Sequence, residues 1–337
     1  MPKSEFHLMG RVPKVKPLSA CARRMKRVFI TEYVGLSTRL EALATAFMIS
    51  DYFGHQVCID WNELDALQIV GAIVRRRGLL GRLNSLKLKG DTRDNFHRIQ
   101  AHRNVNLRTH EGPRHLLERY LLPTAQRVKL RPDLIEVIRD TFALYAHRPL
   151  VGVHIRRGDF PLVSQTEFDV NAFIWPAVPD WWYEHVMAQV QRAVPDVAFF
   201  VSCSGSLDAF PNLQKNFDVF DMPAASPYEY KHHRKAGHQS RRHPAADLFA
   251  LACCSTLVGS TCSTFTHYAA NMLGRPTTIL VPPAHKIFPS QPEFRRLDMH
   301  GRGASDWYAA CRTGKGLQAV SDASSLPITR GACVDWM

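Results

Sequence analysis

The chain has 337 residues, a hydrophobic fraction of 45% and a formal net charge of +13. This length predicts about two domains, and the composition is that of a globular protein with a sizeable core. No run of about 18 apolar residues occurs, so no transmembrane helix is expected. No recognised nucleic-acid-binding module accompanies the positive charge, so nucleic acid is not an expected partner.

A basic N-terminal tail is predicted for residues 1–26. The first 27 residues contain eight Lys or Arg side chains and one acid, Glu5. No apolar segment follows them, so a secretory signal is not expected. The tail is either a solvated, poorly ordered segment or an anchor to an anionic membrane or another polyanion. We expect a cytoplasmic protein, with peripheral contact between its basic segments and the inner face of the membrane as an alternative.

Residues 27–147 are predicted to form a first Rossmann-like domain. Three elements make a β-α-β start, namely a strand at 27–33, a helix at about 40–52 and a strand at 57–61. Gly35 lies in the turn before the helix, Ser37 or Thr38 is the expected N-cap, and Gly54 ends the helix. A polar turn at a helix N-terminus can hold an anion or a sugar.

Residues 65–125 are expected to be helical, basic and irregular. Between Arg75 and Arg108, arginines and lysines are interleaved with leucines. Such a stretch is typical of an amphipathic helix, which lies on a membrane surface or covers a core with its leucines. A helix at about 132–147 then leads into the second domain.

Residues 148–337 are predicted to form a second Rossmann-like domain with a C-terminal extension. Strands are expected at 150–155, 197–202, 217–220, 256–259 and 277–281. Helices are expected between them, at about 181–194, 207–214, 246–254 and 265–273. This alternation predicts parallel, doubly wound sheets. The predicted fold class is therefore α/β, with two Rossmann-like domains whose parallel sheets face a cleft.

The peptide from His154 to Asp159 closes the buried strand at 150–155 and contains the adjacent Arg156 and Arg157. Two arginines at the end of a buried strand are costly to desolvate unless an anion meets them. The guanidinium fork fits phosphate, and α/β sheets bind ligands past the carboxyl ends of their strands. The peptide therefore predicts a site for a phosphate-bearing ligand. The alternative is a structural ion pair between arginine and aspartate.

Hydroxyl side chains crowd the turn at 260–264, just before a predicted helix. Ser263 and Thr264 there could bind an anion with the free N–H groups of the helix, or one of them could serve as an ordinary N-cap. Asp247 lies early in the preceding helix. Its carboxylate could accept hydrogen bonds from a guanine ring, or could stabilise the helix N-terminus.

Cysteine and histidine spacing does not favour a metal site. No CxxC pair occurs, and four cysteines lie in apolar runs, as expected of buried free thiols: Cys58, Cys203, Cys253 and Cys254. The sequence leaves open whether Cys311 and Cys333 pair. The histidines between 232 and 243 lie among lysines and arginines, which would repel a metal ion.

Three blocks of this sequence together resemble the fucosyltransferases that share a His-x-Arg-Arg-Gly-Asp type of peptide. That group includes α-1,6-fucosyltransferases, the rhizobial nodulation enzyme, bacterial α-1,2-fucosyltransferases and, more remotely, protein O-fucosyltransferases. The blocks run from Gly35 to Trp61, from His154 to Asp159 and from Asp247 to Thr264. The resemblance implies a GT-B-like architecture. It also implies transfer of L-fucose from GDP-β-L-fucose to a hydroxyl of a glycan acceptor, with inversion and without a metal cofactor.

The resemblance implies a role for each matching residue. Arg156, with Arg157, would bind the pyrophosphate, and Arg156 would neutralise the departing GDP. Asp247 would bind guanine. Three further residues would line the donor site: His154 in the nucleotide pocket, and Ser263 and Thr264 at the phosphates. Gly35 would border the same site from the first domain, which lies on the acceptor side.

Inversion requires a base that deprotonates the acceptor hydroxyl. Asp159 and Glu167 are the candidates, with Asp169 nearby. Relatives of the α-1,6 type carry a glutamate where this chain has Ser164, and Arg39 stands where relatives often have a neutral residue. Two other functions remain open: transfer from a different nucleotide sugar, or non-catalytic binding of a glycan or polyanion. Four aromatic residues could stack on acceptor sugars or belong to the core: Trp175, Trp181, Trp182 and Tyr183.

Overall fold

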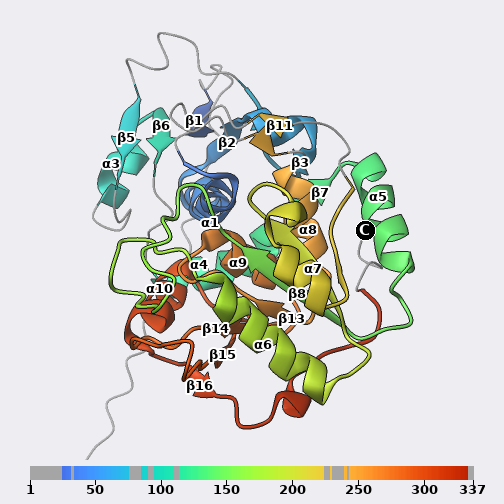
Figure 1. Ribbon diagram of the computed structural model, residues 1–337. Coiled ribbons are helices and arrows are strands. Elements are labelled where there is room, and N and C mark those ends of the chain that lie inside the picture. The colour runs from blue at the N-terminus through green and yellow to red at the C-terminus, as the bar shows by residue number, and fades with distance from the viewer. Residues whose placement is uncertain are drawn as a thin grey trace, which may run out of the picture.

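Two β-sheets with mainly parallel strands organise the computed structural model of the protein (Figure 1). The structure describes residues 25–31, 34–75, 85–89, 95–108, 114–223, 228–229, 239–240 and 243–332. Several predictions concern residues outside these ranges: most of the basic tail, part of the basic stretch after Arg75, the histidines at 232, 233 and 238, and Cys333.

The first sheet has the strand order β4-β2-β1-β6-β5, and every strand pair in it is parallel. Its strands are β1 (Lys26–Thr31), β2 (His55–Asp60), β4 (Ile73–Val74), β5 (Leu86–Leu88) and β6 (Asn104–Leu107). The expectation of a helical region at 65–125 is thus wrong for three of these strands. They are only two to four residues long, which is too short for an alternating pattern to emerge.

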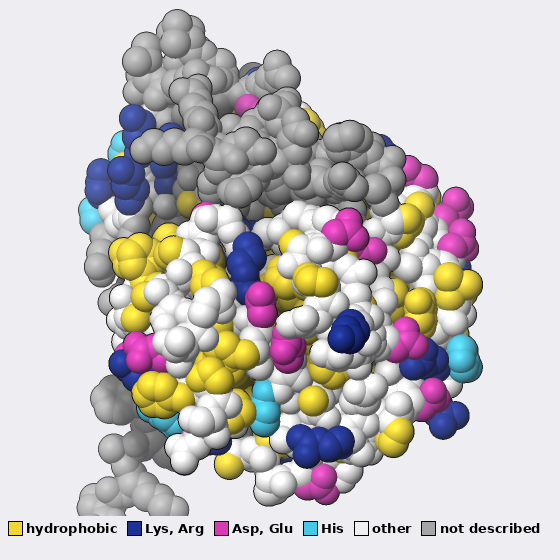
Figure 2. All heavy atoms as spheres, viewed as in Figure 1, with side chains coloured by type: hydrophobic (Ala, Val, Ile, Leu, Met, Phe, Trp, Pro, Cys, Tyr) yellow, Lys and Arg dark blue, Asp and Glu magenta, His cyan; other side chains and the backbone are white. Residues whose placement is uncertain are grey.

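The other elements of the first half surround this sheet. They are α1 (Leu36–Phe53), a 3₁₀ turn (Asn62–Asp65), β3 (Leu67–Ile69), α3 (Phe96–Ala101), α4 (Arg114–Ala125), β7 (Val128–Leu130) and α5 (Pro132–Ala143). β3 pairs with β7 in a separate antiparallel ribbon. Figure 2 shows basic side chains gathered on the surface over β5 and α3, so the described part of the basic stretch lies on several elements and not on one amphipathic helix.

Helix α1 is buried nearly all round, because it lies against β1 and β2 and also contacts α4 and α9. It ends as predicted at Gly54, whose φ of +68° is the left-handed conformation that glycine adopts readily. It begins at Leu36 with Gly35 as the N-cap, so the predicted capping by Ser37 or Thr38 is wrong. The hydroxyls of both residues bond to another helix instead.

The second sheet has the order β10-β9-β8-β13-β14-β15-β16. Its parallel strands are β8 (Leu150–Ile155), β9 (Ala198–Cys203), β10 (Val219–Phe220), β13 (Thr256–Val258) and β14 (Thr278–Val281), and β15 (Arg295–Asp298) and β16 (Gln318–Ala319) add antiparallel. Its helices are α6 (Asp180–Ala193), α7 (Pro211–Asn216), α8 (Pro244–Ala252), α9 (Thr264–Asn271) and α10 (Ala304–Thr313). Two short 3₁₀ turns (Leu207–Ala209 and Ala323–Ser325) and a small ribbon of β11 (Tyr228–Glu229) and β12 (Gln239–Ser240) complete it.

The two sheets, whose strands are mainly parallel, confirm the predicted α/β class. Helix α5 joins them, and its Phe142 ring lies 5.2 Å from that of Phe200 on β9, so this helix packs on the second sheet. The boundary near residue 147 remains a prediction. In the described ranges no helix is long and apolar enough to cross a membrane. The four cysteines expected as buried free thiols are so, and Cys311 is also a buried free thiol.

Candidate functional site

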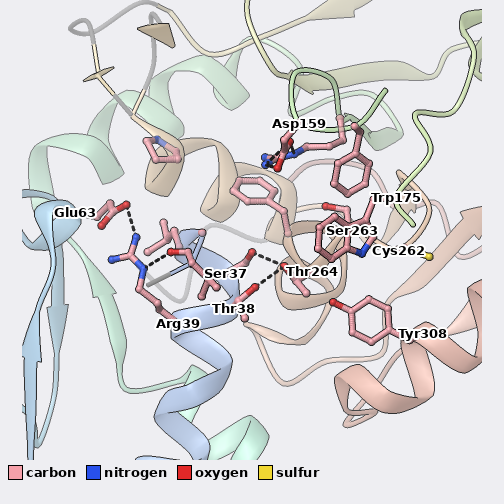
Figure 3. Close-up of a pocket in the computed structure, with 17 residues that line it drawn as sticks. Ser37, Thr38, Arg39, Glu63, Asp159, Trp175, Cys262, Ser263, Thr264 and Tyr308 are labelled. Atoms are coloured by element: carbon pink, nitrogen blue, oxygen red, sulfur yellow. Dashed lines mark hydrogen bonds and ion pairs between the residues drawn. The ribbon is translucent and has the colours of Figure 1, made fainter. Parts of the chain in front are cut away.

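A cavity of about 460 Å³ opens between the two sheets, at the carboxyl ends of β1 and β8 (Figure 3). In the second sheet, β9 and β13 flank β8, so the direction of strand addition reverses beside β8. In the first sheet it reverses beside β1. Such switch points are where α/β sheets bind ligands. The lining residues come from both halves of the chain: 34–39, Glu63, Arg156, Asp159, Phe160, Trp175, Pro244, 262–265 and Tyr308.

Two helix N-termini meet at this cavity. The Thr264 hydroxyl, at the start of α9, lies 2.8 Å from the Ser37 hydroxyl and 3.2 Å from that of Thr38, in the first turn of α1. The N-cap of α1 is Gly35, which has no side chain to cap the helix, and the side chain of Ser263, the N-cap of α9, forms no cap bond. The positive ends of two helix dipoles therefore face one space, and this arrangement favours an anion. A Cβ on Gly35 would meet no protein atom, so glycine there leaves room in the cavity.

Arg156 supplies a full positive charge to the same cavity. Its Nε and Nη2 donate to the two oxygens of Asp159, both at 2.9 Å, and its guanidinium lies 5.5 Å from the centre of the Phe160 ring. Asp159 thus engages one edge of the guanidinium and leaves Nη1 for a ligand. The structural ion pair and the anion site that the sequence offered as alternatives are therefore compatible.

His154 lies beneath the cavity, on β8. It is buried, and its Nδ1 lies 2.7 Å from the Thr266 hydroxyl of α9. Burial, with a smaller contribution from the Arg156 charge, lowers the pKa of His154 to about 3, so its ring is neutral. The ring also packs against Phe265, which lines the cavity. His154 therefore supports α9 from below and is not among the lining residues.

A hydrogen-bonded cluster fixes the end of β8 next to β13. The Ser260 hydroxyl accepts from the backbone N–H of Arg156 at 2.7 Å and donates to the carbonyl of His154 at 2.9 Å. The Tyr183 hydroxyl lies 2.8 Å from that of Ser260. Burial raises the pKa of Tyr183 to about 12, which keeps its proton in place. Ser260 thus fixes the backbone at His154 and at Arg156, and Tyr183 holds the Ser260 hydroxyl in place.

Five of the residues that the sequence proposed for the donor site and catalysis line the cavity together: Gly35, Arg156, Asp159, Ser263 and Thr264. The other four, which are His154, Arg157, Glu167 and Asp247, are not in the lining. Arg157 pairs with Asp180 at the start of α6 and contacts the Phe210 ring. Glu167 pairs with Lys286 at 3.1 Å on the surface.

Asp247 is also outside the cavity lining. It is buried on α8, where it accepts a hydrogen bond from Ser202 on β9 at 3.0 Å. Pro244, in the turn before it on the same helix, does line the cavity. Asp247 is therefore close behind the wall, one helical turn from the space that a ligand would enter.

Sequence reasoning missed Glu63 and Tyr308 at the site, and it noted Arg39 only as a departure from the relatives. Arg39 and Glu63 form a buried pair at 2.6 Å, and both line the cavity (Figure 3). Tyr308 of α10 reaches it from the other side. Burial, and secondarily the nearby Glu41 carboxylate, raise the pKa of Tyr308 well above its usual value. No motif marks Glu63 or Tyr308, which lie in two separate segments outside the three blocks of the resemblance.

Cys262 adds local strain at the cavity wall. Its φ of +59° makes it the only non-glycine residue with positive φ in the described part of the chain. Its backbone N–H donates to the Cys311 sulfur at 3.3 Å. Such strained conformations persist only where the surroundings hold them, and they cluster at functional sites.

A buried ion pair joins the two helices behind the cavity. The Glu41 carboxylate of α1 lies 2.6 Å from Nδ1 of His267 on α9, and both side chains are almost fully buried. Burial by itself lowers the pKa of His267, but the Glu41 carboxylate and a hydrogen bond to the Arg302 carbonyl outweigh it and raise the pKa above 6.5. The pair therefore couples the two halves of the chain through charge.

The structure separates the four aromatic candidates. Trp182 and Tyr183 are fully buried core residues, and Trp181 packs partly buried against the same core. Trp175 lines the cavity and is 47% exposed. Across the described ranges, no group of three or more His, Cys, Asp or Glu side chains is placed to hold a metal ion.

No protein-family model matches the chain, and no curated protein matches it in sequence. Among solved structures it is similar to NodZ, an α-1,6-fucosyltransferase from Bradyrhizobium, in crystals soaked with GDP-fucose. The identity is 16%, the match covers 81% of this chain and 99% of NodZ, and the TM-score is 0.46. It is also similar to a mutant of FUT1 of Arabidopsis thaliana in complex with GDP, with 12% identity over 77% of this chain and 70% of FUT1 and a TM-score of 0.46. The similarity to POFUT1 in complex with GDP-fucose has 8% identity over 73% of this chain and 94% of POFUT1, with a TM-score of 0.46. At such identities, the function has to be inferred from the residues of this chain.

Proposed function

We propose that the protein is an inverting fucosyltransferase that moves L-fucose from GDP-β-L-fucose to a hydroxyl of a glycan acceptor. One observation carries this proposal: Arg156 and the N-termini of α1 and α9 converge on one cavity at the junction of two parallel sheets. That arrangement suits a diphosphate. The resemblance of the peptide from His154 to Asp159 to that of fucosyltransferases is the reason for proposing GDP-fucose as the donor.

The positive groups at the cavity have a direct role in this reaction. As the acceptor oxygen bonds to the anomeric carbon, the bond from that carbon to the β-phosphate oxygen breaks, and its electron pair leaves with GDP. Arg156, Ser263 and Thr264 would stabilise the charge that develops on that oxygen. These groups meet the diphosphate with protein charge and N–H dipoles, so we propose that transfer needs no divalent cation.

Asp159 is our proposed base. It is a carboxylate at the cavity wall, and its side chain is 35% exposed. It would take the proton of the acceptor hydroxyl during attack on the face opposite GDP, which inverts the anomeric centre. Glu167 is the second candidate, although its surface pair with Lys286 holds it outside the lining. Comparison of Asp159→Asn with Glu167→Gln distinguishes them: the variant of the true base loses transfer, whereas the other variant keeps it.

Arg157 is proposed to orient Arg156, since it donates to the Arg156 carbonyl at 3.0 Å.

Asp247 is proposed to bind guanine after a modest movement of α8 brings its carboxylate to the cavity. Asp247→Asn should narrow the difference in affinity between GDP and UDP, measured by titration calorimetry. An unchanged ratio in a variant with wild-type melting would contradict this role.

Calorimetric titration with GDP, GDP-fucose, GDP-mannose and UDP, with and without EDTA, tests the function. We expect GDP and GDP-fucose to bind in the micromolar range without sensitivity to EDTA, and Arg156→Ala to abolish binding. The matched control is Arg139→Ala, which removes an exposed arginine of α5. Absence of nucleotide binding by the folded protein would overturn the proposal in favour of a glycan-binding protein.

A further inference from the structure

Large hydrophobic side chains are exposed at the mouth of the cavity. Of the eleven exposed large hydrophobic residues in the described part of the chain, five lie between 162 and 175. With Phe288 they form what we call the apolar patch: Leu162, Val163, Phe173, Ile174, Trp175 and Phe288. Contiguous exposed apolar surface marks an interaction site in many proteins.

Apart from Phe288, the apolar patch belongs to one segment that is held by hydrogen bonds, the rim loop (residues 160–175). Phe168 and Ile287 exchange two backbone hydrogen bonds of 2.9 Å, and this pairing places Phe288 next to the loop. The Arg312 guanidinium donates to the carbonyl of Val170 at 3.4 Å. Phe168 and Val170 are buried, so the rim loop already packs its own apolar residues inward. The exposure of the others is therefore a property of the folded loop.

The rim loop is also a wall of the cavity. The Trp175 ring is stacked on Phe160, with centroids 6.3 Å apart and an interplanar angle of 14°, and both rings line the cavity. The Arg156 guanidinium lies over the other ring of this pair, that of Phe160. A partner that covers the apolar patch would therefore sit at the entrance to the proposed donor site.

Positive charge accompanies the apolar patch on one face. Figure 2 shows hydrophobic side chains over the rim loop and, above them, basic side chains over β5 and α3. The exposed basic residues of these two elements and the turns after them are Lys87, Lys89, Arg98 and Arg103. Within the rim loop, Glu167 is neutralised by Lys286 and the Asp169 carboxylate accepts from the Asn171 N–H at 2.8 Å. This combination suits an anionic lipid surface.

We propose that the rim loop inserts into the head-group region of an anionic bilayer, while the basic side chains of β5 and α3 contact lipid phosphates. The cavity then opens toward the membrane surface and takes its acceptor from there, as a lipid-anchored glycan. The class of acceptor rests on the proposed function, whereas the docking surface does not.

The residue types favour hydrocarbon over a soluble sugar. Sugar rings stack on flat aromatic faces, and three residues of the apolar patch offer such faces: Phe173, Trp175 and Phe288. Leu162, Val163 and Ile174 are aliphatic and have no such face, yet Ile174 is 63% exposed. Interfacial segments combine aliphatic and Trp side chains with nearby Lys and Arg, as this surface does.

Vesicle binding of the full chain tests the docking surface without any donor. We expect binding to vesicles of phosphatidylcholine with phosphatidylglycerol, and none to phosphatidylcholine alone. The double variant Val163→Ser with Ile174→Ser should weaken binding at least about tenfold. Lys87→Gln and Lys89→Gln should each weaken it about fivefold. Leu144→Ser, which removes an exposed leucine just after α5, is the matched control and should bind as wild type does.

Fluorescence fixes the orientation and separates the outcomes. Brominated lipids should quench Trp175, so the quenching should disappear in Trp175→Phe. Vesicle binding equal in the double variant and in wild type, or quenching that persists in Trp175→Phe, overturns the docking surface. Quenching of Trp175 by soluble oligosaccharides without vesicle binding overturns it in favour of a sugar platform. If vesicles bind as expected but no nucleotide does, the proposed transferase fails and the docking surface stands.

Discussion

The buried pair of Glu41 and His267 makes a sharp prediction, because it joins the two helices whose N-termini form the site. In Glu41→Gln the charge partner of His267 is removed while the shape is kept. Breaking a buried ion pair costs about 3 kcal/mol or more. The unfolding entropy of about 2.1 cal/mol/K per residue gives about 0.7 kcal/mol/K for this chain, so Tm should fall by about 4 °C.

The effect should depend on pH in a defined direction. The pKa of His267 is raised in the folded protein, above the 6.5 of the unfolded chain. The charged pair therefore contributes fully below pH 6.5, and its contribution is lost as the pH rises through the folded pKa. The Tm difference between wild type and Glu41→Gln should be largest near pH 6 and should shrink at alkaline pH.

Melting followed by circular dichroism at several pH values measures this difference. The control is Glu136→Gln, an exposed glutamate of α5 that should change Tm little at any pH. Equal losses of Tm near pH 6 and at alkaline pH would refute the charged pair. So would a Glu41→Gln variant that melts as wild type does near pH 6.

Three further outcomes are expected at the cavity. Arg156→Lys should weaken GDP binding at least about tenfold in calorimetry, because an ammonium cannot keep the two bonds to Asp159 and reach a phosphate at the same time; an affinity within about twofold of wild type would contradict this. The NMR signal of the His154 ring should not titrate between pH 5 and pH 8, since its pKa is about 3; a midpoint in that range would disprove its burial as a neutral ring. In a double-mutant cycle, Ser37→Ala and Thr264→Val should couple by about 1 kcal/mol in stability, and additive losses would argue against their hydrogen bond.

Local signals in the sequence were enough for much of the second half of the fold. The apolar run at 150–155 and the four parallel strands after it appear within a residue or two of their predicted positions, since continuous apolar runs separated by helices leave few alternatives. The antiparallel strands β15 and β16 were not predicted. Gly54 ended α1 as expected. The short strands β4, β5 and β6 were not predictable, because pairing with neighbours, rather than their own pattern, makes them strands.

For the candidate site too, the sequence determined some features and the tertiary structure decided others. The sequence by itself determined that Arg156 and Asp159 follow a buried strand and that Ser263 and Thr264 begin a helix, because these are short-range facts of the chain. Only the tertiary structure decided that Thr264 meets Ser37 more than 220 residues away. It also turned Glu167 toward Lys286, outside the cavity. Which side chains share a cavity depends on how two sheets pack, and packing is set by the sum of many distant contacts that no local pattern encodes.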